Sequence, residues 1–119
     1  FQVQPKEQAK LIRVISGEVF DVVVDIREDS KTFGQYFHSI LSAENKKMLY
    51  IPPGFAHGFL ALKDNTEFLY KVSNFYSPEH ERGILWNDPA LHIPWPKLDT
   101  EYILSEKDKK NPTLHEIFH

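Results

Sequence analysis

The sequence predicts an all-β domain, a sandwich or a barrel, on three observations. Short runs with strand-like alternation recur along the chain, and turn residues separate them. The length of 119 residues, with 41% hydrophobic and 26% charged residues, suits a globular chain with a single core. We therefore expect residues 1–119 to form one domain with little helix.

The N-terminal part contains two β-branched runs, residues 9–15 and 18–26, separated by a Ser-Gly turn dipeptide. This pattern predicts a β-hairpin. Alternation puts Asp21 on the opposite face from the most apolar residues of the second run, and puts Lys10 on one face with apolar residues of the first. Two interpretations stay open: a solvated sheet face that carries these charges, or a barrel interior that holds Lys10 near a carboxylate such as Asp21.

Four further strands are predicted beyond a polar connection that ends at Gly34. They cover residues 35–42, 47–51, 57–62 and 66–73. The turn between the last two contains Asp-Asn, a pair that tolerates the left-handed conformation.

The C-terminal part is predicted to be mostly irregular. Segment 75–96 contains four prolines and reads as a loop, and we expect its two tryptophans, Trp86 and Trp95, to pack as a lid on the sheet. A serine followed by acidic residues predicts a short helical turn at 105–108.

Residues 50–62 place a lone histidine, His57, between two apolar runs. Two prolines that cannot donate ladder hydrogen bonds and a glycine that can take positive φ precede it, so we expect a strand to end near residue 51 and to restart at about His57. His57 would then lie at a strand mouth, where a closed barrel keeps its ligand site. The spacing Pro-x-Gly-x-x-His is similar to that of cupin barrels, in which this histidine often binds a metal. The alternative is a turn with a hydrogen-bonded histidine.

Composition limits the classes of partner. The net charge of −3 comes from interspersed signs, which gives no electrostatic support for binding to nucleic acid or to a membrane surface. The chain has no cysteine, hence no disulfide, thiolate nucleophile or cysteine zinc site, and no apolar run long enough for a membrane span or a signal peptide. A cytoplasmic location is the default expectation.

Five ordered segments extend over nearly the whole chain: residues 10–27, 51–62 (Ile-Pro-Pro-Gly-Phe-Ala-His-Gly-Phe-Leu-Ala-Leu), 68–71, 76–84 (Tyr-Ser-Pro-Glu-His-Glu-Arg-Gly-Ile) and 86–90 (Trp-Asn-Asp-Pro-Ala). Together they closely resemble the dTDP-4-dehydrorhamnose 3,5-epimerase family. The resemblance implies an all-β double-stranded β-helix, the cupin or jelly-roll barrel, with a short C-terminal helical segment and a homodimeric assembly.

The same resemblance implies an isomerase. Its substrate would be a dTDP-4-keto-6-deoxy sugar nucleotide, dTDP-4-dehydro-6-deoxy-D-glucose, and its product dTDP-4-dehydro-L-rhamnose, which leads to dTDP-L-rhamnose for cell-surface polysaccharide. Epimerisation at C3 and C5 requires a base, an acid on the opposite face and a cation or donor for the enolate oxygen. It requires no cofactor, and we expect no metal.

Site residues follow from the resemblance, position by position. It makes Tyr70 the acid, places Lys10 where it can stabilise the enolate, and makes Asp108 the residue that orients the general-base histidine. The remaining residues would contact substrate: His57, Tyr76 (stacking on thymine), Glu81, Lys107 and Asp21. Taken singly, each of these residues also has an ordinary structural explanation, such as a strand tyrosine or a solvated charge.

The general base itself is expected outside this sequence. Family members carry it in an Arg-Gly-Leu-His-Phe type of motif whose phenylalanine corresponds to Phe1, so the base would be the residue before Phe1. The family's diphosphate-binding arginines would also precede Phe1. We therefore expect the chain that begins at Phe1 to be nearly inactive alone.

Two other functional classes compete with this interpretation. A metal-dependent cupin would normally use a His-x-His pair, and none occurs in this sequence. A non-catalytic sugar-nucleotide binder fits a chain without its base. Related 3- or 5-epimerases that act on other dTDP-keto sugars share the same pattern.

Overall fold

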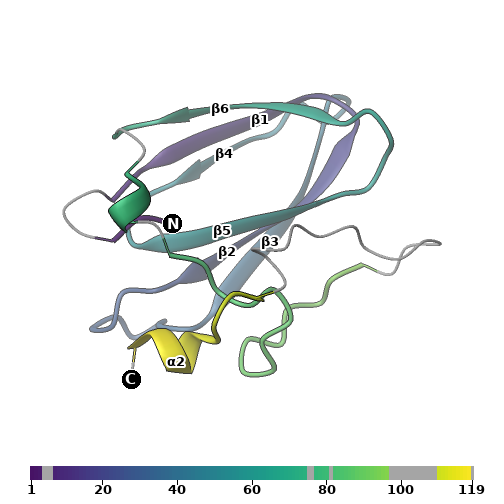
Figure 1. Cartoon of the computed structure of the whole chain (residues 1–119). Coiled ribbons are helices and arrows are strands. Elements are labelled where there is room, and N and C mark those ends of the chain that lie inside the picture. Colours follow the sequence, from purple (N-terminus) through teal and green to yellow (C-terminus); the bar gives the residue numbers. More distant parts are fainter. Residues whose placement is uncertain (4–6, 75–76, 81, 97–109, 119) are drawn as a thin grey trace.

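The computed structural model describes residues 1–3, 7–74, 77–80, 82–96 and 110–118. Within them, six strands form two antiparallel three-stranded sheets, with the orders β4-β1-β6 and β3-β2-β5 (Figure 1). The strands are β1 (Lys10–Ser16), β2 (Glu18–Asp25), β3 (Tyr36–Ser42), β4 (Met48–Ile51), β5 (Phe55–Ala61) and β6 (Glu67–Val72). Helix in these residues includes the 3-10 turn η1 (Pro78–His80) and the short helix α2 (Leu114–Phe118). The all-β prediction is confirmed.

Every predicted strand is present, with ends that differ by one or two residues. The largest difference is at β5, which starts at Phe55 rather than at His57. Gly54 adopts a φ of 92° and completes the turn early, so Phe55 already pairs with Asp25.

The predicted N-terminal hairpin is wrong, because β1 pairs with β4 and β6, whereas β2 pairs with β3 and β5 (Figure 1). The chain changes sheets at Gly17, which has a φ of 85° and lies so close to Thr66 that a Cβ would come within 2.3 Å of the threonine hydroxyl oxygen. This crossing places Val14 and Val19 in one core between the sheets. Burial of both inner faces therefore prevails over the local turn signal.

Strand β2 is buried on both faces. Its inner face belongs to the core between the sheets, whose buried members are Ile12, Val14, Val19, Leu41 and Ile51. Asp21 and Asp25 lie on this inner face and are buried. The interpretation of this face as solvated is therefore wrong, because the face is interior. That Lys10 lies near Asp21 in a barrel stays a prediction.

The outer face of β2 is covered by the C-terminal part of the chain (Figure 1). The Phe20 ring lies 5.6 Å from the ring of Trp95, whose indole N–H donates to the Trp86 carbonyl oxygen at 2.7 Å, so Trp95 packs on the sheet as predicted. Buried Asp88 accepts the backbone N–H of Leu114 at 2.8 Å and thereby fixes α2 to the covering segment.

A short C-terminal helical segment is present as α2, but the sequence did not predict its position, and the helical turn predicted at 105–108 lies outside the described residues. No helix in the described part of the chain is long and apolar enough to cross a membrane.

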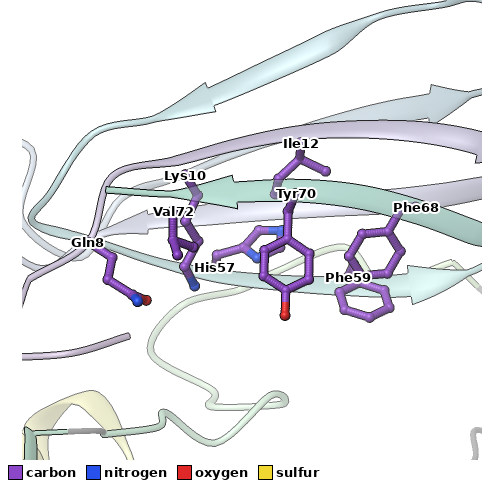
Figure 2. Close-up of a pocket in the computed structure, with 8 residues that line it drawn as sticks. All are labelled: Gln8, Lys10, Ile12, His57, Phe59, Phe68, Tyr70 and Val72. Atoms are coloured by element: carbon purple, nitrogen blue, oxygen red, sulfur yellow. The ribbon is translucent and has the colours of Figure 1, made fainter. Parts of the chain in front are cut away.

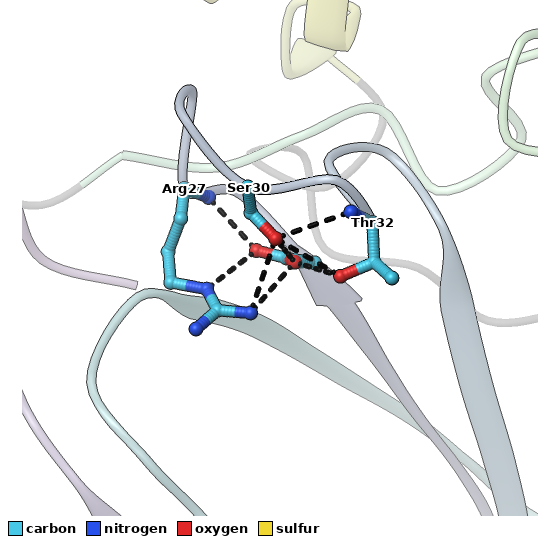
Figure 3. A network of polar contacts seen from close by, with 4 residues as sticks. Arg27, Ser30 and Thr32 are labelled. Atoms are coloured by element: carbon cyan, nitrogen blue, oxygen red, sulfur yellow. Dashed lines mark hydrogen bonds and ion pairs between the residues drawn. The ribbon is translucent and has the colours of Figure 1, made fainter.

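A polar network at the end of β2 braces the connection between β2 and β3 (Figure 3). Asp25, 3% exposed, accepts hydrogen bonds from Arg27 Nε at 3.0 Å, from Arg27 Nη2 at 2.9 Å and from Ser30 Oγ at 2.7 Å, and it also accepts one from the Thr32 hydroxyl. The Arg27 guanidinium lies 4.9 Å from the centre of the Phe55 ring. Hydrogen bonding from Arg27, followed by that from Thr32 and Ser30, outweighs desolvation and lowers the pKa of Asp25 well below its usual range.

Replacing Asp25 by asparagine is expected to lower the free energy of unfolding by about 1–3 kcal/mol at neutral pH, because charge-assisted hydrogen bonds are lost. The folded-state pKa of Asp25 is depressed, so the stabilisation is complete above the unfolded pKa of about 4 and is lost progressively as the pH falls from there through the lower folded-state pKa. Denaturant unfolding at neutral pH and at about pH 3 should therefore show that the difference in unfolding free energy between the parental protein and Asp25→Asn is smaller in acid. The exposed Asp64→Asn is the matched control; an equal loss in both variants would contradict the prediction.

Candidate active site

A pocket of about 540 Å³ opens between the two sheets on the side of β5 and β6 (Figure 2). Its lining comes from β1, β5, β6 and the residues before β1: Gln8, Lys10, Ile12, His57, Phe59, Phe68, Tyr70 and Val72. The two inner sheet faces thus provide one mixed polar and aromatic cavity.

Strand register explains why the polar groups converge. In the β1–β6 pair, Lys10 lies opposite Val72 and Ile12 lies opposite Tyr70, so all four side chains share the inner face. Figure 2 shows Lys10 and Tyr70 extending from this sheet toward β5, which carries His57. Three site residues expected from the sequence, Lys10, His57 and Tyr70, therefore lie in one pocket.

Asp21 holds His57 in place. His57 Nε2 lies 2.8 Å from Asp21 Oδ2, and the two side chains are 10% and 1% exposed respectively. Register sets this contact, because Asp21 lies opposite Phe59 and is therefore the diagonal neighbour of His57 on the same face. A carboxylate that accepts from Nε2–H leaves the Nδ1 lone pair of a neutral imidazole available. Asp21, expected as a substrate contact, thus touches the pocket through His57.

Asp21 also carries an unusual feature for a buried carboxylate. Within the described residues, its Oδ1 atom is buried and has no hydrogen-bond partner. Such an oxygen is costly to bury, and the other carboxylate oxygen, Oδ2, makes the contact with His57.

The other expected site residues, Tyr76, Glu81, Lys107 and Asp108, lie outside the described part of the chain. Sequence reasoning missed five lining residues, namely Gln8, Ile12, Phe59, Phe68 and Val72. The strand period of two was the available signal for the aromatics, because Phe59 follows His57 by two positions and Phe68 precedes Tyr70 by two. These two rings meet edge to face, with centroids 4.5 Å apart.

The site contains the groups needed for proton transfer next to a carbonyl. An ammonium, a phenol and an oriented imidazole lie in one cavity with aromatic walls, where charge on an oxygen atom can be stabilised and a proton can be delivered. Among the described residues, no group of three or more His, Asp, Glu or Cys side chains is placed to hold a metal ion. Fold and site together define a two-sheet β protein with an acid–base cavity between its sheets.

Comparison with known proteins narrows this class. The family described as dTDP-4-dehydrorhamnose 3,5-epimerase matches residues 1–116, and the chain belongs to this family. The enzyme of that name from Pseudomonas aeruginosa is 57% identical over 103 residues, which cover 87% of this chain and 56% of the relative. The one from Shigella flexneri is 55% identical over 108 residues, 91% of this chain and 59% of the relative.

Solved structures agree with this assignment. An epimerase from Legionella pneumophila in complex with dTDP-4-keto-L-rhamnose superposes with a TM-score of 0.94 and 48% identity, covering 98% of this chain and 61% of that one. A 3'-monoepimerase from Streptomyces bikiniensis in complex with dTDP-quinovose superposes with a TM-score of 0.90 and 36% identity. The match covers 97% of this chain and 58% of that one. The chain thus spans about three fifths of the length of these relatives.

Proposed function

We propose that the full-length protein is a dTDP-4-dehydrorhamnose 3,5-epimerase, an isomerase that converts dTDP-4-dehydro-6-deoxy-D-glucose to dTDP-4-dehydro-L-rhamnose in dTDP-L-rhamnose biosynthesis. One observation carries the proposal: Lys10, His57 and Tyr70 converge in one pocket of a chain that is about half identical to enzymes of this name.

The proposed mechanism assigns each group a step. A base removes the proton α to the C4 ketone, and the electrons move onto the ketone oxygen as an enolate. The Lys10 ammonium stabilises that oxygen, and the Tyr70 hydroxyl delivers a proton to the opposite face of the carbon, which inverts it. His57, oriented by Asp21, binds the sugar. This scheme uses protein groups alone and needs no cofactor.

Four further assignments rest on the family resemblance. Asp108 would orient the general-base histidine that the resemblance places before Phe1, and Tyr76, Glu81 and Lys107 would contact the nucleotide and sugar. Membership of the family supports these roles.

The finer architecture is also part of the proposal. We assign residues 1–119 to one jelly-roll domain of the cupin type, working as a cytoplasmic homodimer. The outer face of sheet β4-β1-β6 supports the dimer, because its register brings together the exposed apolar residues Ile15, Met48, Tyr50 and Leu69. Such a patch is typical of a face that a partner covers.

A second candidate is a related 3- or 5-epimerase that inverts one centre of another dTDP-keto sugar. The similarity to the Streptomyces bikiniensis 3'-monoepimerase favours it, since that backbone also superposes closely. A non-catalytic sugar-nucleotide binder is the third.

Proton NMR of the 4-keto substrate with full-length protein in deuterated buffer separates these functions. The proposed enzyme should introduce deuterium at both C3 and C5 and yield the L-configured product, without loss of activity on treatment with a chelator. Label at one carbon alone would indicate a mono-epimerase, and binding without label would indicate a non-catalytic protein. Loss of turnover on chelation would refute the metal-free mechanism.

A further inference from the structure

The pocket has a polar end and an apolar end, and Tyr70 lies between them (Figure 2). Gln8, Lys10 and His57 form the polar end. The rings of Phe59 and Phe68 lie beyond Tyr70. The centroid of the Phe68 ring is 5.9 Å from that of the Tyr70 ring, and the Phe68 ring meets the Phe59 ring edge to face. Among the described lining residues, the only other side chain near this end is that of Ile12, which pairs with Tyr70.

This gradient, the change from a polar end to an apolar end, follows from the order of the inward-facing side chains along two strands that belong to different sheets. On β5, the inner face passes from His57 to Phe59, and on β6 it passes from Tyr70 to Phe68. Both strands therefore become aromatic in the same direction. Among the described residues, the side chains of Phe59, Phe68 and Ile12 at this end offer a hydroxyl group no hydrogen-bond partner.

The chemistry of the proposed reaction orients a sugar along this gradient. The C4 oxygen must lie near the Lys10 ammonium, and C5 must lie within reach of the Tyr70 hydroxyl. C6 is bonded to C5 on the side away from C4. The substituent at C6 is therefore directed past Tyr70, toward the aromatic end.

We infer that Phe59 and Phe68 form an apolar subsite for the C6 methyl group and thereby select 6-deoxy sugar nucleotides over their 6-hydroxy counterparts. This inference rests on the proposed function and adds a specificity determinant to it. A hydroxyl in place of a hydrogen at C6 would face two aromatic rings that offer it no hydrogen bond in exchange for water, and apolar pockets discriminate against an added hydroxyl by at most about 100-fold. We expect a preference of about 10- to 100-fold in Kd.

The test compares two ligands that differ only at C6, dTDP-quinovose (6-deoxyglucose) and dTDP-glucose. Neither carries a 4-ketone, so neither reacts, and calorimetry with the full-length protein gives Kd directly. The parental protein should bind the 6-deoxy ligand about 10- to 100-fold more tightly. Phe59→Asn should bring the ratio toward unity, whereas Phe59→Leu should preserve it, because leucine keeps the wall apolar.

Phe59 is 46% exposed, so both variants should fold, which circular dichroism verifies. Phe37→Asn is the control, because Phe37 is 58% exposed on β3 and outside the pocket lining. If the parental protein bound dTDP-quinovose and dTDP-glucose with equal Kd values but still turned over the 4-keto substrate, the inference would be wrong and the proposed function would stand. Absence of both binding and turnover would overturn it together with the proposed function. A ratio that Phe59→Asn leaves unchanged would also overturn it.

Discussion

Replacing Lys10 by alanine in the full-length protein is expected to suppress both deuterium exchange and inversion by about 10²–10³-fold. Lys10 provides the ammonium group in the pocket that contains Tyr70 and His57, and an enolate without a cation is costly to form in a partly dry cavity. Proton removal itself therefore becomes difficult, and both readouts fall together. NMR of the 4-keto substrate in deuterated buffer measures exchange and product in one experiment.

Lys71→Ala is the matched control for this change. Lys71 lies on the same sheet, but it pairs with Leu11 on the outer face and is exposed, so its loss should alter neither readout. If Lys10→Ala kept normal exchange while inversion fell, Lys10 would act after proton removal, and its assignment to the enolate would be wrong.

Replacing Tyr70 by phenylalanine is expected to separate the two readouts. Without its acid, inversion at C5 should fall by about 10²–10⁴-fold, while deuterium should still enter the substrate as the base takes and returns protons on one face. The fold should tolerate the change, because Tyr70 is exposed and, within the described residues, its hydroxyl makes no hydrogen bond whose partner would be left unpaired.

Tyr50→Phe controls for the loss of an exposed phenol on β4, another strand of the same sheet, since Tyr50 lies opposite Leu11 on the outer face. It should leave exchange and inversion unchanged. Inversion of C5 at the parental rate in Tyr70→Phe would show that another donor reaches this face.

Strand positions could be predicted from the sequence because the signal for them is local. Alternation and turn residues located all six strands to within two residues, and they placed Asp21 opposite the apolar face of its strand. Strand pairing could not be predicted in the same way. The turn at Gly17 suits a hairpin, but the chain crosses there to the second sheet, where Val14 and Val19 share a core. That choice depends on pairing with strands that follow later in the chain, β4 and β6 for β1, and β3 and β5 for β2, which a local pattern does not contain.

The candidate site shows the same division. The motif around His57 and the ordered segments pointed to the family, and through it to Lys10 and Tyr70, because a reaction at a ketone needs particular residue types. Helix α2 was missed, because five residues carry little periodicity and the helix is fixed by a contact from the distant Asp88.

The sequence alone determined the β class, the strand limits and the chemical types available to the site. Only the tertiary structure decided that β1, β5 and β6 contribute to one cavity, that Asp21 contacts His57, and that Phe59 and Phe68 line the apolar end. The physical reason is that side-chain direction along a strand follows from local backbone geometry. Which faces meet is set instead by burial and hydrogen bonding between strands remote in sequence.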